Sequence, residues 1–498
     1  MNVNPITRLD YPDPDVIRVE DTYYMVSTTM HFMPGCEILQ SFDLVHWEHV
    51  TYVYETLDHT DAQQLKSGQN IYGQGMWAAS LRYHEGRFYI CFVANDTRKT
   101  YLYTSKKIDG PWKKQLIEGF YHDGSLLFDE DGRNYIVYGN DEIWITELNE
   151  DLIAPKKDGL HRLLVSDHKN PELGYEGSHI QKINGYYYIF LVHSLRDRWM
   201  RTEACFYSDS LEGEFTGGDV LCDDRGYCGQ GVAQGGIVDT PDGKWYAMLF
   251  QDSGAVGRLP ILLPVTWKDH FPVFGQNGHV PEEIEVHSTR PGYIYQPLVG
   301  SDDFCNGLLP RWQFNHDPDP QYYHLDALQG TYTITTREVC TELTQAVNTL
   351  TQRMSYPSCA AEVTVDASAL KEGDVAGLCA FQGCYAAVGI TKHHGKYEVL
   401  MLDKKEDGIL DMTEGTVVES HQMDFRLEAD FCNMKDEARC YYRVNKGDWL
   451  PIGTVHKLYF KLDHFTGCRF GLFCYAAEET GGSACFRDFK YYDVDEIS

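Results

Sequence analysis

The feature that most constrains the fold of this chain is a repeat in its first half. Five segments each contain a short apolar strand, a turn and a strand rich in aromatic residues, and they end at Tyr24, Tyr89, Tyr135, Tyr188 and Tyr246. The turns are Glu20-Asp21, Glu85-Gly86, Asp131-Gly132, Asn184-Gly185 and Asp242-Gly243. Successive tyrosines are 65, 46, 53 and 58 residues apart. Because these steps match a four-stranded blade with its loops, the sequence predicts a five-bladed β-propeller.

One position of this repeat carries side chains suited to chemistry. It lies twelve residues before the tyrosine, or eleven in the first repeat, and is occupied by Asp13, Trp77, Asp123, Glu176 and Gln234. The innermost strand of every blade starts beside the propeller axis, so equivalent positions of different blades converge there. A single acid before a strand is commonly a turn residue, but three acids in register predict a shared site. Two carboxyl groups in different surroundings divide into a general base and a general acid.

Length and charge set the class of protein and of ligand. At 498 residues and 57.0 kDa the chain is too long for one core, so we expect two or three domains. The 43 Lys and Arg residues stand against 74 Asp and Glu residues, a formal charge of -31. Such a surface repels phosphate backbones and anionic membranes, so we expect neither nucleic acid nor membrane as a partner. A neutral ligand is favoured, and the sequence leaves a homo-oligomer open.

The cysteines and the first residues indicate a compartment. Fifteen cysteines is an odd number, none forms a C-x-x-C motif, and many lie in apolar runs, as Cys91, Cys379 and Cys474 do. This usage is typical of buried free thiols in a reducing compartment. The first ten residues contain no apolar core of a signal peptide, and no run reaches transmembrane length. We therefore expect a cytoplasmic protein.

The repeat ends before a change in organisation. The segment 287–300 has two prolines, two glycines and no clear period, so it is the expected linker between domains 1–300 and 301–498. Short alternating strands follow, expected at 332–335, 361–365, 397–402, 425–429 and 457–462. Strands of this length and density predict a two-sheet β-sandwich. The predicted fold class is therefore all-β, a propeller followed by a sandwich.

Several motifs, in this order along the chain, carry a resemblance to a known family. They are Asn4-Pro5 with Tyr11-Pro12-Asp13-Pro14-Asp15, Trp77-Ala78-Ala79-Ser80, His122-Asp123-Gly124-Ser125, Glu176-Gly177-Ser178-His179, Gly257-Arg258, and Ser301-Asp302-Asp303-Phe304. Together they resemble glycoside hydrolase family 43, the β-xylosidases and α-L-arabinofuranosidases. The resemblance implies a five-bladed propeller and a C-terminal xylosidase-type sandwich of the jelly-roll, concanavalin-like kind.

The resemblance also implies roles for single residues. Asp13 matches the general base, Glu176 the general acid, and Asp123 the third acid that orients the general acid and favours its protonated form. Arg258 matches a sugar-binding arginine, and Trp77 lies where an aromatic side chain packs against the sugar. Gln234 stands where many members have a histidine near the sugar or a central metal, which puts a propeller calcium in doubt.

Four further residues are weaker candidates. His31 follows the first aromatic strand and is a candidate for the pocket rim and for substrate binding, against the alternative of a solvated loop histidine. Asp302, Asp303 and Asp488 resemble carboxylates that hold a structural calcium in related sandwiches. Strand-edge acids are an equally common explanation. No cofactor is expected for catalysis itself.

The predicted function is an exo-acting, inverting hydrolase that releases terminal β-D-xylosyl and/or α-L-arabinofuranosyl residues from hemicellulose-derived oligosaccharides. Cytoplasmic placement favours imported oligosaccharides as substrates. One alternative is a fructan or sucrose hydrolase, whose expected Asn-Asp-Pro and Glu-Cys motifs are replaced here by Tyr11-Pro12-Asp13 and Glu176-Gly177. Another alternative is a non-catalytic carbohydrate-binding propeller, which has no need of three acids.

Overall fold

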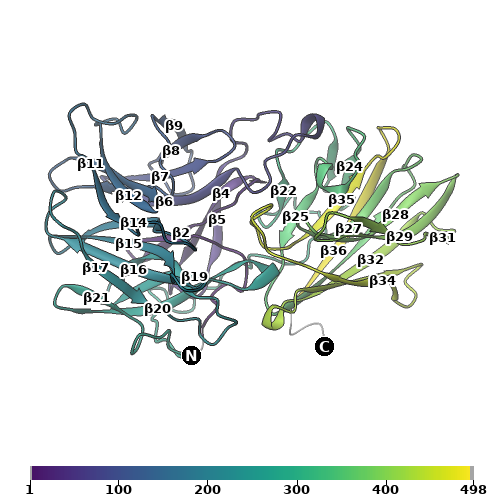
Figure 1. The fold of residues 1–498 in the computed structure, drawn as a ribbon. Coiled ribbons are helices and arrows are strands. Elements are labelled where there is room, and N and C mark those ends of the chain that lie inside the picture. The colour runs from purple at the N-terminus through teal and green to yellow at the C-terminus, as the bar shows by residue number, and fades with distance from the viewer. Residues whose placement is uncertain (1–2, 494–498) are drawn as a thin grey trace.

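The chain folds into two all-β domains that lie side by side (Figure 1). The computed structural model describes residues 3–493, and this part contains strands and four one-turn 3-10 helices: η1 (Lys66–Gly68), η2 (Gly254–Val256), η3 (Leu343–Gln345) and η4 (Cys432–Met434). The purple-to-teal half of Figure 1 is a propeller, and the green-to-yellow half is a sandwich. None of the described helices is long and apolar enough to cross a membrane.

The propeller has five blades, each a four-stranded antiparallel sheet. The first two blades are β1 (Asp15–Val19), β2 (Thr22–Val26), β4 (Gly35–Ser41) and β5 (Glu48–Tyr54), then β6 (Met76–His84), β7 (Arg87–Ala94), β8 (Lys99–Ser105) and β9 (Lys113–Ile117). The third and fourth are β10 (Ser125–Phe128), β11 (Asn134–Asn140), β12 (Glu142–Leu148) and β13 (His161–Ser166), then β14 (Glu176–Ile183), β15 (Tyr186–Ser194), β16 (Arg201–Ser208) and β17 (Thr216–Leu221). The fifth is β18 (Val232–Asp239), β19 (Trp245–Asp252), β20 (Arg258–Lys268) and β21 (Phe271–Phe274). The five predicted aromatic strands are the second strands of these blades, so the propeller prediction is confirmed.

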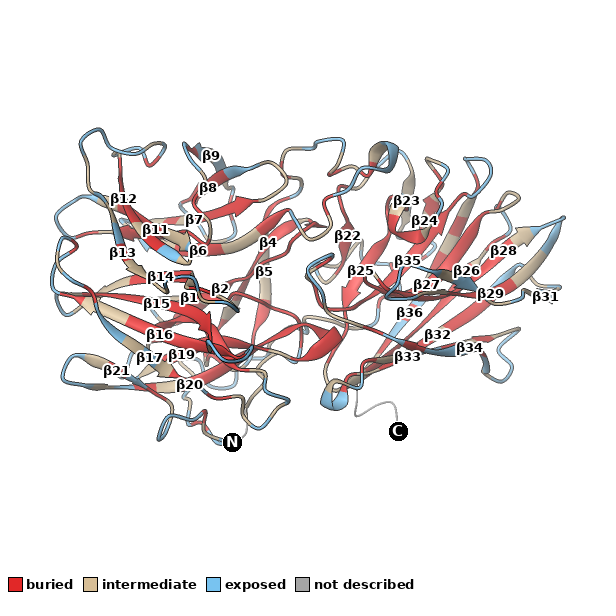
Figure 2. Cartoon of the chain, viewed as in Figure 1, coloured by how far each residue is buried: buried red, intermediate tan, exposed pale blue. Residues whose placement is uncertain are grey.

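Local sequence accounts for the hairpin at the start of a blade. In the turns Glu85-Gly86 and Asn184-Gly185 the φ angles are 46° and 74°, and 51° and 85°. A two-residue type I′ turn requires positive φ at both positions, which glycine and asparagine adopt readily. Apolar residues on the facing sheets of neighbouring blades then form five clusters, one for each pair of adjacent blades. These clusters are the red strand interiors of Figure 2.

A buried polar hub holds the inner strands together at the axis. Arg82 donates from Nη1 to Asp15 Oδ2 at 2.8 Å and from Nη2 to Ser125 Oγ at 2.7 Å. The other oxygen of Asp15 lies 3.0 Å from His179 Nδ1. Burial alone would raise the pKa of Asp15, but Arg82 and His179 hold it below its usual value. Because these four residues come from four blades, the hub fixes how the blade entrances face one another.

The second domain is a sandwich of two antiparallel sheets that share one large apolar core. One sheet contains β3 (Phe32–Met33), β22 (Gln313–Asn315), β25 (Leu350–Arg353), β35 (Arg469–Tyr475), β27 (Val375–Phe381), β28 (Ala386–His393), β29 (Lys396–Lys404), β30 (Leu410–Met412) and β31 (Thr416–Val418). The other contains β23 (Tyr323–Asp326), β24 (Thr331–Thr335), β36 (Ser483–Asp493), β26 (Ser358–Asp366), β32 (Gln422–Asp430), β33 (Glu437–Arg443) and β34 (Leu450–Lys457). The predicted sandwich is therefore confirmed.

The two domains are joined by shared structure. Strand β3 follows the first aromatic strand of the propeller, yet it pairs with β22 at the edge of a sandwich sheet. Arg353 of the sandwich is buried and donates to Glu37 Oε2 at 2.8 Å and to the Asp10 carbonyl at 2.9 Å. Burial alone would raise the pKa of Glu37, but Arg353 and His49 lower it to about 2. The interface is thus held by a buried ion pair, in which Arg353 Nη2 has no hydrogen-bond partner within residues 3–493.

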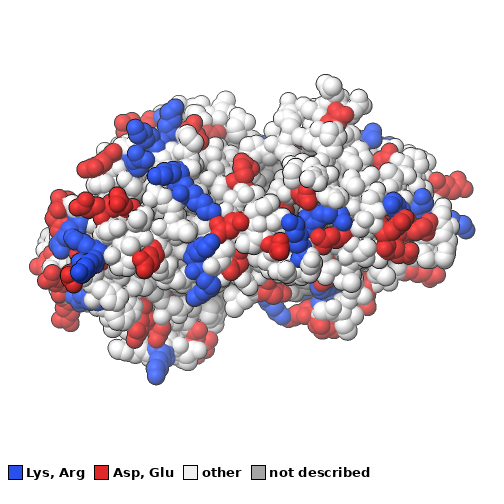
Figure 3. All heavy atoms as spheres, turned by 90° about the horizontal axis from the view of Figure 1, so that it is seen from above, with Lys and Arg blue, Asp and Glu red and all other residues white. Residues whose placement is uncertain are grey.

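The charged surface and the cysteines agree with what the composition indicates. On the face seen in Figure 3, Lys and Arg residues form separate groups among the acidic side chains of both domains. All fifteen cysteines are free thiols, and ten of them are buried. The cytoplasmic location stays a prediction.

Candidate active site

The five residues of the repeated position all lie at the starts of inner strands. Asp13 and Asp123 come two residues before β1 and β10, and Glu176 is the first residue of β14. Trp77 and Gln234 lie where the pairing of β6 and β18 shifts register. Asp13, Asp123 and Gln234 have left-handed φ angles of 53°, 48° and 64°. Such angles cost non-glycine residues about 1–2 kcal/mol each. These backbone angles interrupt the alternation of side chains along the strands, so the three side chains do not point toward either face of their sheets.

Asp13 is held in a buried position by two hydrogen-bond donors. Its side chain accepts a hydrogen bond from Thr28 Oγ1 at 2.6 Å and one from Arg258 Nη1 at 3.0 Å. Arg258 is 2% exposed, and its guanidinium lies 4.2 Å from the ring centre of Phe465, a residue of the sandwich. Cation–π contact and the ion pair together fix the guanidinium beside Asp13.

Asp123 and Glu176 share a third partner, His122. His122 Nε2 lies 3.5 Å from Asp123 Oδ2 and 3.6 Å from Glu176 Oε2. Burial, followed by the negative charges of Glu176 and Asp13, raises the pKa of Asp123 to about 6 in spite of His122. Burial alone would lower the pKa of His122, but Asp123, Glu176 and Asp13 raise it to about 9. The site therefore holds three carboxyl groups and one imidazolium.

Close packing fixes the backbone beside Glu176. Gly177 donates from its N–H to Asp123 Oδ2 at 3.1 Å. Its φ is 65°, and a Cβ atom there would lie 2.7 Å from Gln234 Cγ, so only glycine fits without displacing that side chain. The N–H of Gln234 in turn donates to Glu203 Oε2 at 2.7 Å. Gln234 therefore packs on the backbone that carries the acid.

A cavity of about 800 Å³ opens in front of this cluster. Glu176, His122 and Trp77 lie in its wall. The sandwich supplies another part of the wall through Phe460 and Phe465, which belong to the loop 458–468 between β34 and β35. The volume lies within the roughly 300–1,000 Å³ of ligand pockets in proteins. The cavity is therefore a joint product of both domains.

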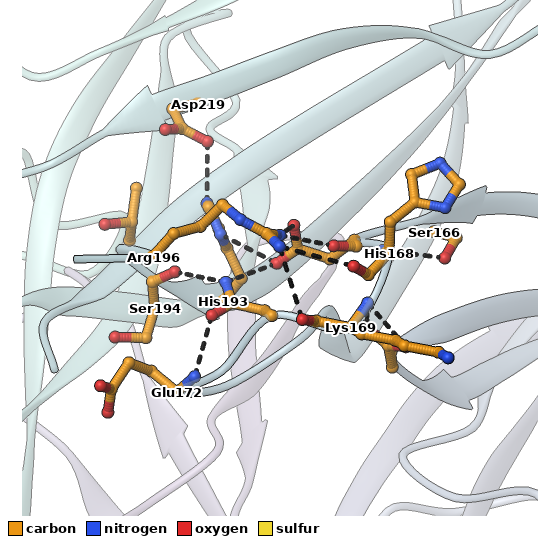
Figure 4. A network of polar contacts seen from close by, with 12 residues as sticks. Ser166, His168, Lys169, Glu172, His193, Ser194, Arg196 and Asp219 are labelled. Carbon is orange, nitrogen blue, oxygen red and sulfur yellow. Dashed lines mark hydrogen bonds and ion pairs between the residues drawn. The ribbon is translucent and has the colours of Figure 1, made fainter. Parts of the chain in front are cut away.

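Two braced loops form the rim of the cavity: 167–175, which connects the third blade to the fourth, and 195–200 within the fourth blade. Arg196 Nη1 donates to the Asp167 carbonyl at 2.7 Å, and Asn170 Nδ2 donates to the Ser194 carbonyl at 2.8 Å (Figure 4). His193 Nε2 pairs with Asp219 Oδ1 at 2.8 Å beneath them. Burial alone would lower the pKa of His193, but Asp219 and Asp167 raise it.

The braced loops present an aromatic residue to the cavity. Glu172 and Leu173 of the first loop and Trp199 after the second line the cavity. Trp199 is 44% exposed, unlike most large aromatic side chains of this chain. An exposed indole on a rigid rim is suited to packing against the apolar face of a sugar ring.

Comparison with known proteins assigns the family. The sequence profile described as glycosyl hydrolases family 43 matches residues 3–272, and the profile described as a beta-xylosidase C-terminal concanavalin A-like domain matches residues 301–492. The chain belongs to family 43 of the glycosyl hydrolases. The resemblance found in the motifs is confirmed, and family membership makes the chain a glycosidase.

Similar proteins carry related names. A β-xylosidase of Formosa agariphila is 27% identical, and the match covers 99% of this chain and 89% of that protein. A non-reducing-end α-L-arabinofuranosidase of Bacteroides ovatus is 25% identical over 82% of this chain and 79% of that protein. Among solved structures, a bifunctional GH43-CE protein of Bacteroides eggerthii has a TM-score of 0.92 at 42% identity. The match covers 100% of this chain and 64% of that protein, so this chain spans less than two thirds of its length.

Within this family 43 chain, most of the predicted site residues lie together. Asp13, Asp123 and Glu176 surround His122, Trp77 lies in the cavity wall, and Gln234 lies behind Glu176. Arg258 binds Asp13 and touches the cavity through Phe465 rather than lining it directly.

His31 lies elsewhere than expected. Its side chain is 0% exposed and is enclosed by the rings of Phe32, Tyr72, His316 and His464 at the interface of the domains. It does not line the cavity, so the expected position at the pocket rim is wrong. The physical reason is β3, because the residues after His31 turn into the sandwich sheet instead of crossing the top of the blade.

The calcium site expected at Asp302, Asp303 and Asp488 stays a prediction. Both oxygens of Asp302 are occupied, since Oδ1 accepts from the Phe304 N–H at 2.7 Å and Oδ2 from Trp312 Nε1 at 2.8 Å. Burial raises the pKa of Asp302. Within residues 3–493, only His122, Asp123 and Glu176 bring three metal-binding side chains within 4.8 Å, and Asp302, Asp303 and Asp488 do not.

Four residues of the site were not found from the sequence. His122 and Asn140 contact Glu176, and Trp199 and Phe465 line the cavity. His122 directly precedes Asp123 in the sequence, so its position next to a predicted acid could have identified it. The other three lie outside the repeated position, and their contacts depend on how blades and domains meet.

Proposed function

We propose that the protein releases terminal β-D-xylosyl and/or α-L-arabinofuranosyl residues from hemicellulose-derived oligosaccharides. The observation that carries the proposal is that Asp13, Asp123 and Glu176, from three blades, act together on His122. Glu176 and His122 lie in the wall of one cavity. The names of the similar proteins support a pentosyl substrate. The two sugars place their hydroxyl groups similarly around the anomeric carbon, so one pocket accepts both.

In the proposed reaction a water molecule adds to the anomeric carbon as the glycosidic C–O bond breaks. Asp13 takes one proton from this water, and Glu176 gives one proton to the departing oxygen. The carboxyl groups thereby exchange protonation states, and solvent restores them between turnovers. The water enters opposite to the leaving group, so the configuration at the anomeric carbon inverts.

The surroundings of the two carboxyl groups support this division of roles. Asp13 has Arg258 next to it, and the two form an ion pair at 3.0 Å. Glu176 has Asp123 next to it instead, and that carboxyl group is mainly ionised at pH 7 because its pKa is about 6. Two carboxyl groups in such different surroundings are suited to divide into a base and an acid.

Attack from chain ends follows from the wall that the sandwich supplies. Phe460 and Phe465 stand on the side of the cavity that faces the sandwich, so a polysaccharide running through the site would meet them. A terminal sugar fits such a one-sided pocket. Release of internal, mid-chain products from long xylan would contradict the exo mode.

The test uses a panel of nitrophenyl glycosides together with xylo-oligosaccharides, on the wild type and on Glu176→Ala. A nitrophenolate leaves without much help, whereas a sugar alkoxide needs a proton. Glu176→Ala should therefore lose about 10²–10⁴-fold in kcat/KM on oligosaccharides and far less on nitrophenyl glycosides. NMR of the first product formed from a β-xyloside should show α-xylose.

Three results would contradict the general-acid role, the inversion and the hydrolysis respectively. Equal losses on both substrate types would mean that Glu176 binds sugar or supports the fold. Initial β-xylose would exclude inversion. A folded protein that binds xylo-oligosaccharides but hydrolyses no member of the panel would be a binding propeller.

A further inference from the structure

Two nitrogen atoms lie next to one oxygen of Glu176, and they come from Asn140 and His122. The roles assigned to the three acids do not explain either residue. Asn140 Nδ2 donates to Glu176 Oε2 at 2.7 Å, and His122 Nε2 lies 3.6 Å from the same oxygen. No residue within 3–493 hydrogen bonds to the other oxygen, Oε1, and Glu176 lines the cavity. The two oxygens of this carboxyl group therefore have different surroundings.

The two donors belong to one structural unit. His122 precedes β10 and Asn140 is the last residue of β11, both in the third blade, while Glu176 starts the fourth. The N–H of Gly139 donates to the His122 carbonyl at 3.1 Å, which links the two segments. Gly139 has a φ of 144°, and a Cβ atom there would lie 1.9 Å from the Glu142 carbonyl oxygen. A glycine is required for this close approach, and it places Asn140 at the entrance of the blade.

His122 carries a positive charge throughout the neutral range. Its pKa of about 9 results from Asp123, Glu176 and Asp13, which face it together with the uncharged ring of Trp77 at 5.8 Å. A protonated imidazole carries N–H groups on both nitrogens and has no acceptor. Nε2 lies 3.6 Å from Glu176 Oε2 and 3.5 Å from Asp123 Oδ2 without a hydrogen bond to either, so His122 acts on both oxygens through its charge.

We propose that Asn140 and His122 are positioning residues that keep Oε2 of Glu176 an acceptor and thereby place its transferable proton on Oε1. An oxygen that accepts from an amide N–H cannot carry an O–H on the same side without bringing hydrogens together, and the nearby imidazolium charge favours a lone pair there. Oε1 meets no such donor within residues 3–493, and Glu176 lines the cavity. The inference rests on the proposed role of Glu176 as the general acid.

The contacts from Asn140 and His122 and the charge of Asp123 act on Glu176 in opposite directions. Donors to a carboxylate favour its ionised form, whereas the charge of Asp123 favours the protonated form. Removing a donor therefore has two effects. The proton is no longer confined to the oxygen nearest the substrate, and the acid keeps its proton to higher pH.

The test compares Asn140→Ala with Asn95→Ala on aryl xylosides of graded leaving-group acidity and on xylobiose. Asn95 is the matched control, because it lines the same cavity but makes no contact with Glu176. Asn140→Ala should lose roughly 10–100-fold in kcat/KM on xylobiose, less than the 10²–10⁴-fold of a whole general acid, and little on nitrophenyl xyloside. Its pH–rate profile should have an alkaline limb shifted upward. Asn95→Ala should affect all leaving groups equally and leave the profile in place.

His122→Gln supplies a second measurement, since glutamine keeps an amide donor but carries no charge. Its alkaline limb should also move upward, with a smaller dependence on leaving group than in Asn140→Ala. If Asn140→Ala loses equally on all leaving groups with an unshifted profile, while Glu176→Ala shows the selective loss, the positioning role is refuted and the proposed function stands. If Glu176→Ala itself loses equally on all substrates, the proposed function fails first.

Discussion

The buried histidines between the domains should make this protein sensitive to acid. The ring centre of His31 lies 5.0 Å from that of His316 and 5.6 Å from that of His464. Neither ring nitrogen of His31 has a hydrogen-bond partner within residues 3–493. Burial and then the two other histidines lower the pKa of His31 well below its usual value. Burial likewise lowers the pKa of His316 well below the usual range and that of His464 to about 4.

The size of the effect follows from proton linkage. An unfolded histidine has a pKa of about 6.5 and takes up a proton below that pH, whereas the buried ring stays neutral. The unfolded state then binds more protons, so the free energy of unfolding falls as the pH falls. One such histidine costs about 1.4 kcal/mol between pH 7.5 and pH 5.5. Three together cost about 4 kcal/mol, a large part of the roughly 5–15 kcal/mol of a typical protein. The full stability is present above about pH 6.5 and decreases toward the folded-state pKa values.

His31→Phe isolates one member of this cluster. Phenylalanine keeps a ring among Phe32 and Tyr72 but removes two unpaired nitrogens and one titrating group. The variant should gain about 1–3 kcal/mol at neutral pH, because an unsatisfied buried polar group costs about that much. Its loss of stability between pH 7.5 and pH 5.5 should be smaller than that of the wild type by about 1.4 kcal/mol. Urea unfolding at the two pH values measures both quantities.

The control is His324→Phe, since His324 is an exposed residue of β23. It should leave the pH dependence of unfolding unchanged. Equal pH dependence in wild type and His31→Phe would refute the reasoning, because it would mean that His31 binds its proton equally well folded and unfolded.

Two further predictions concern the cavity. Asp13→Asn keeps the shape of the side chain but cannot accept a proton from water, so turnover on xylosides should fall by about 10²–10⁴-fold while circular dichroism shows an unchanged fold; near wild-type turnover would remove Asp13 from the mechanism. Trp199→Ala should raise KM for xylotriose by about tenfold, the equivalent of roughly 1.4 kcal/mol of aromatic contact, and should change kcat little. A KM that does not change for xylotriose would mean that the exposed indole does not contact the substrate.

The propeller and its three acids were predictable because both are encoded locally. Each blade contributes one hairpin with its own turn residues, and the acid stands at a fixed distance from the tyrosine of that hairpin. The hub of Arg82 and Asp15 then brings blade entrances together, so register in the sequence becomes proximity in space. Reasoning of this kind needs only the period of the repeat and the geometry of a propeller.

The structure of the loop 458–468 was not predictable from the sequence. Residues 457–462 were expected to form a strand, and that expectation is wrong, since β34 ends at Lys457 and the chain then enters the cavity. Apolar side chains such as Phe460 and Leu462 line that cavity instead of a sheet interior. A wall of a cavity and the core of a sheet require the same residue types, so composition does not separate them. Asn140 has no pattern either, because its partner Glu176 lies in another blade.

Asp10, Asp13 and Asp15 lie in β1 or just before it, and they connect the two domains to the site. Asp15 anchors the hub of the propeller, and Asp13 faces Arg258 in the site. Asp10 holds both domains at once, because Oδ1 accepts from the N–H of Arg258 and Oδ2 accepts from the N–H of Gly467, each at 2.8 Å.

Gly467 follows Phe465 by two residues, and Phe465 covers the guanidinium of Arg258. One carboxylate thus sets the distance between the arginine that holds Asp13 and the sandwich residue that closes the cavity. On the other side of Phe465 stands His464, a member of the acid-sensitive cluster. Protonation of that cluster therefore acts on the segment that shapes the catalytic cavity, and the stability of the interface and the geometry of the site depend on the same few residues.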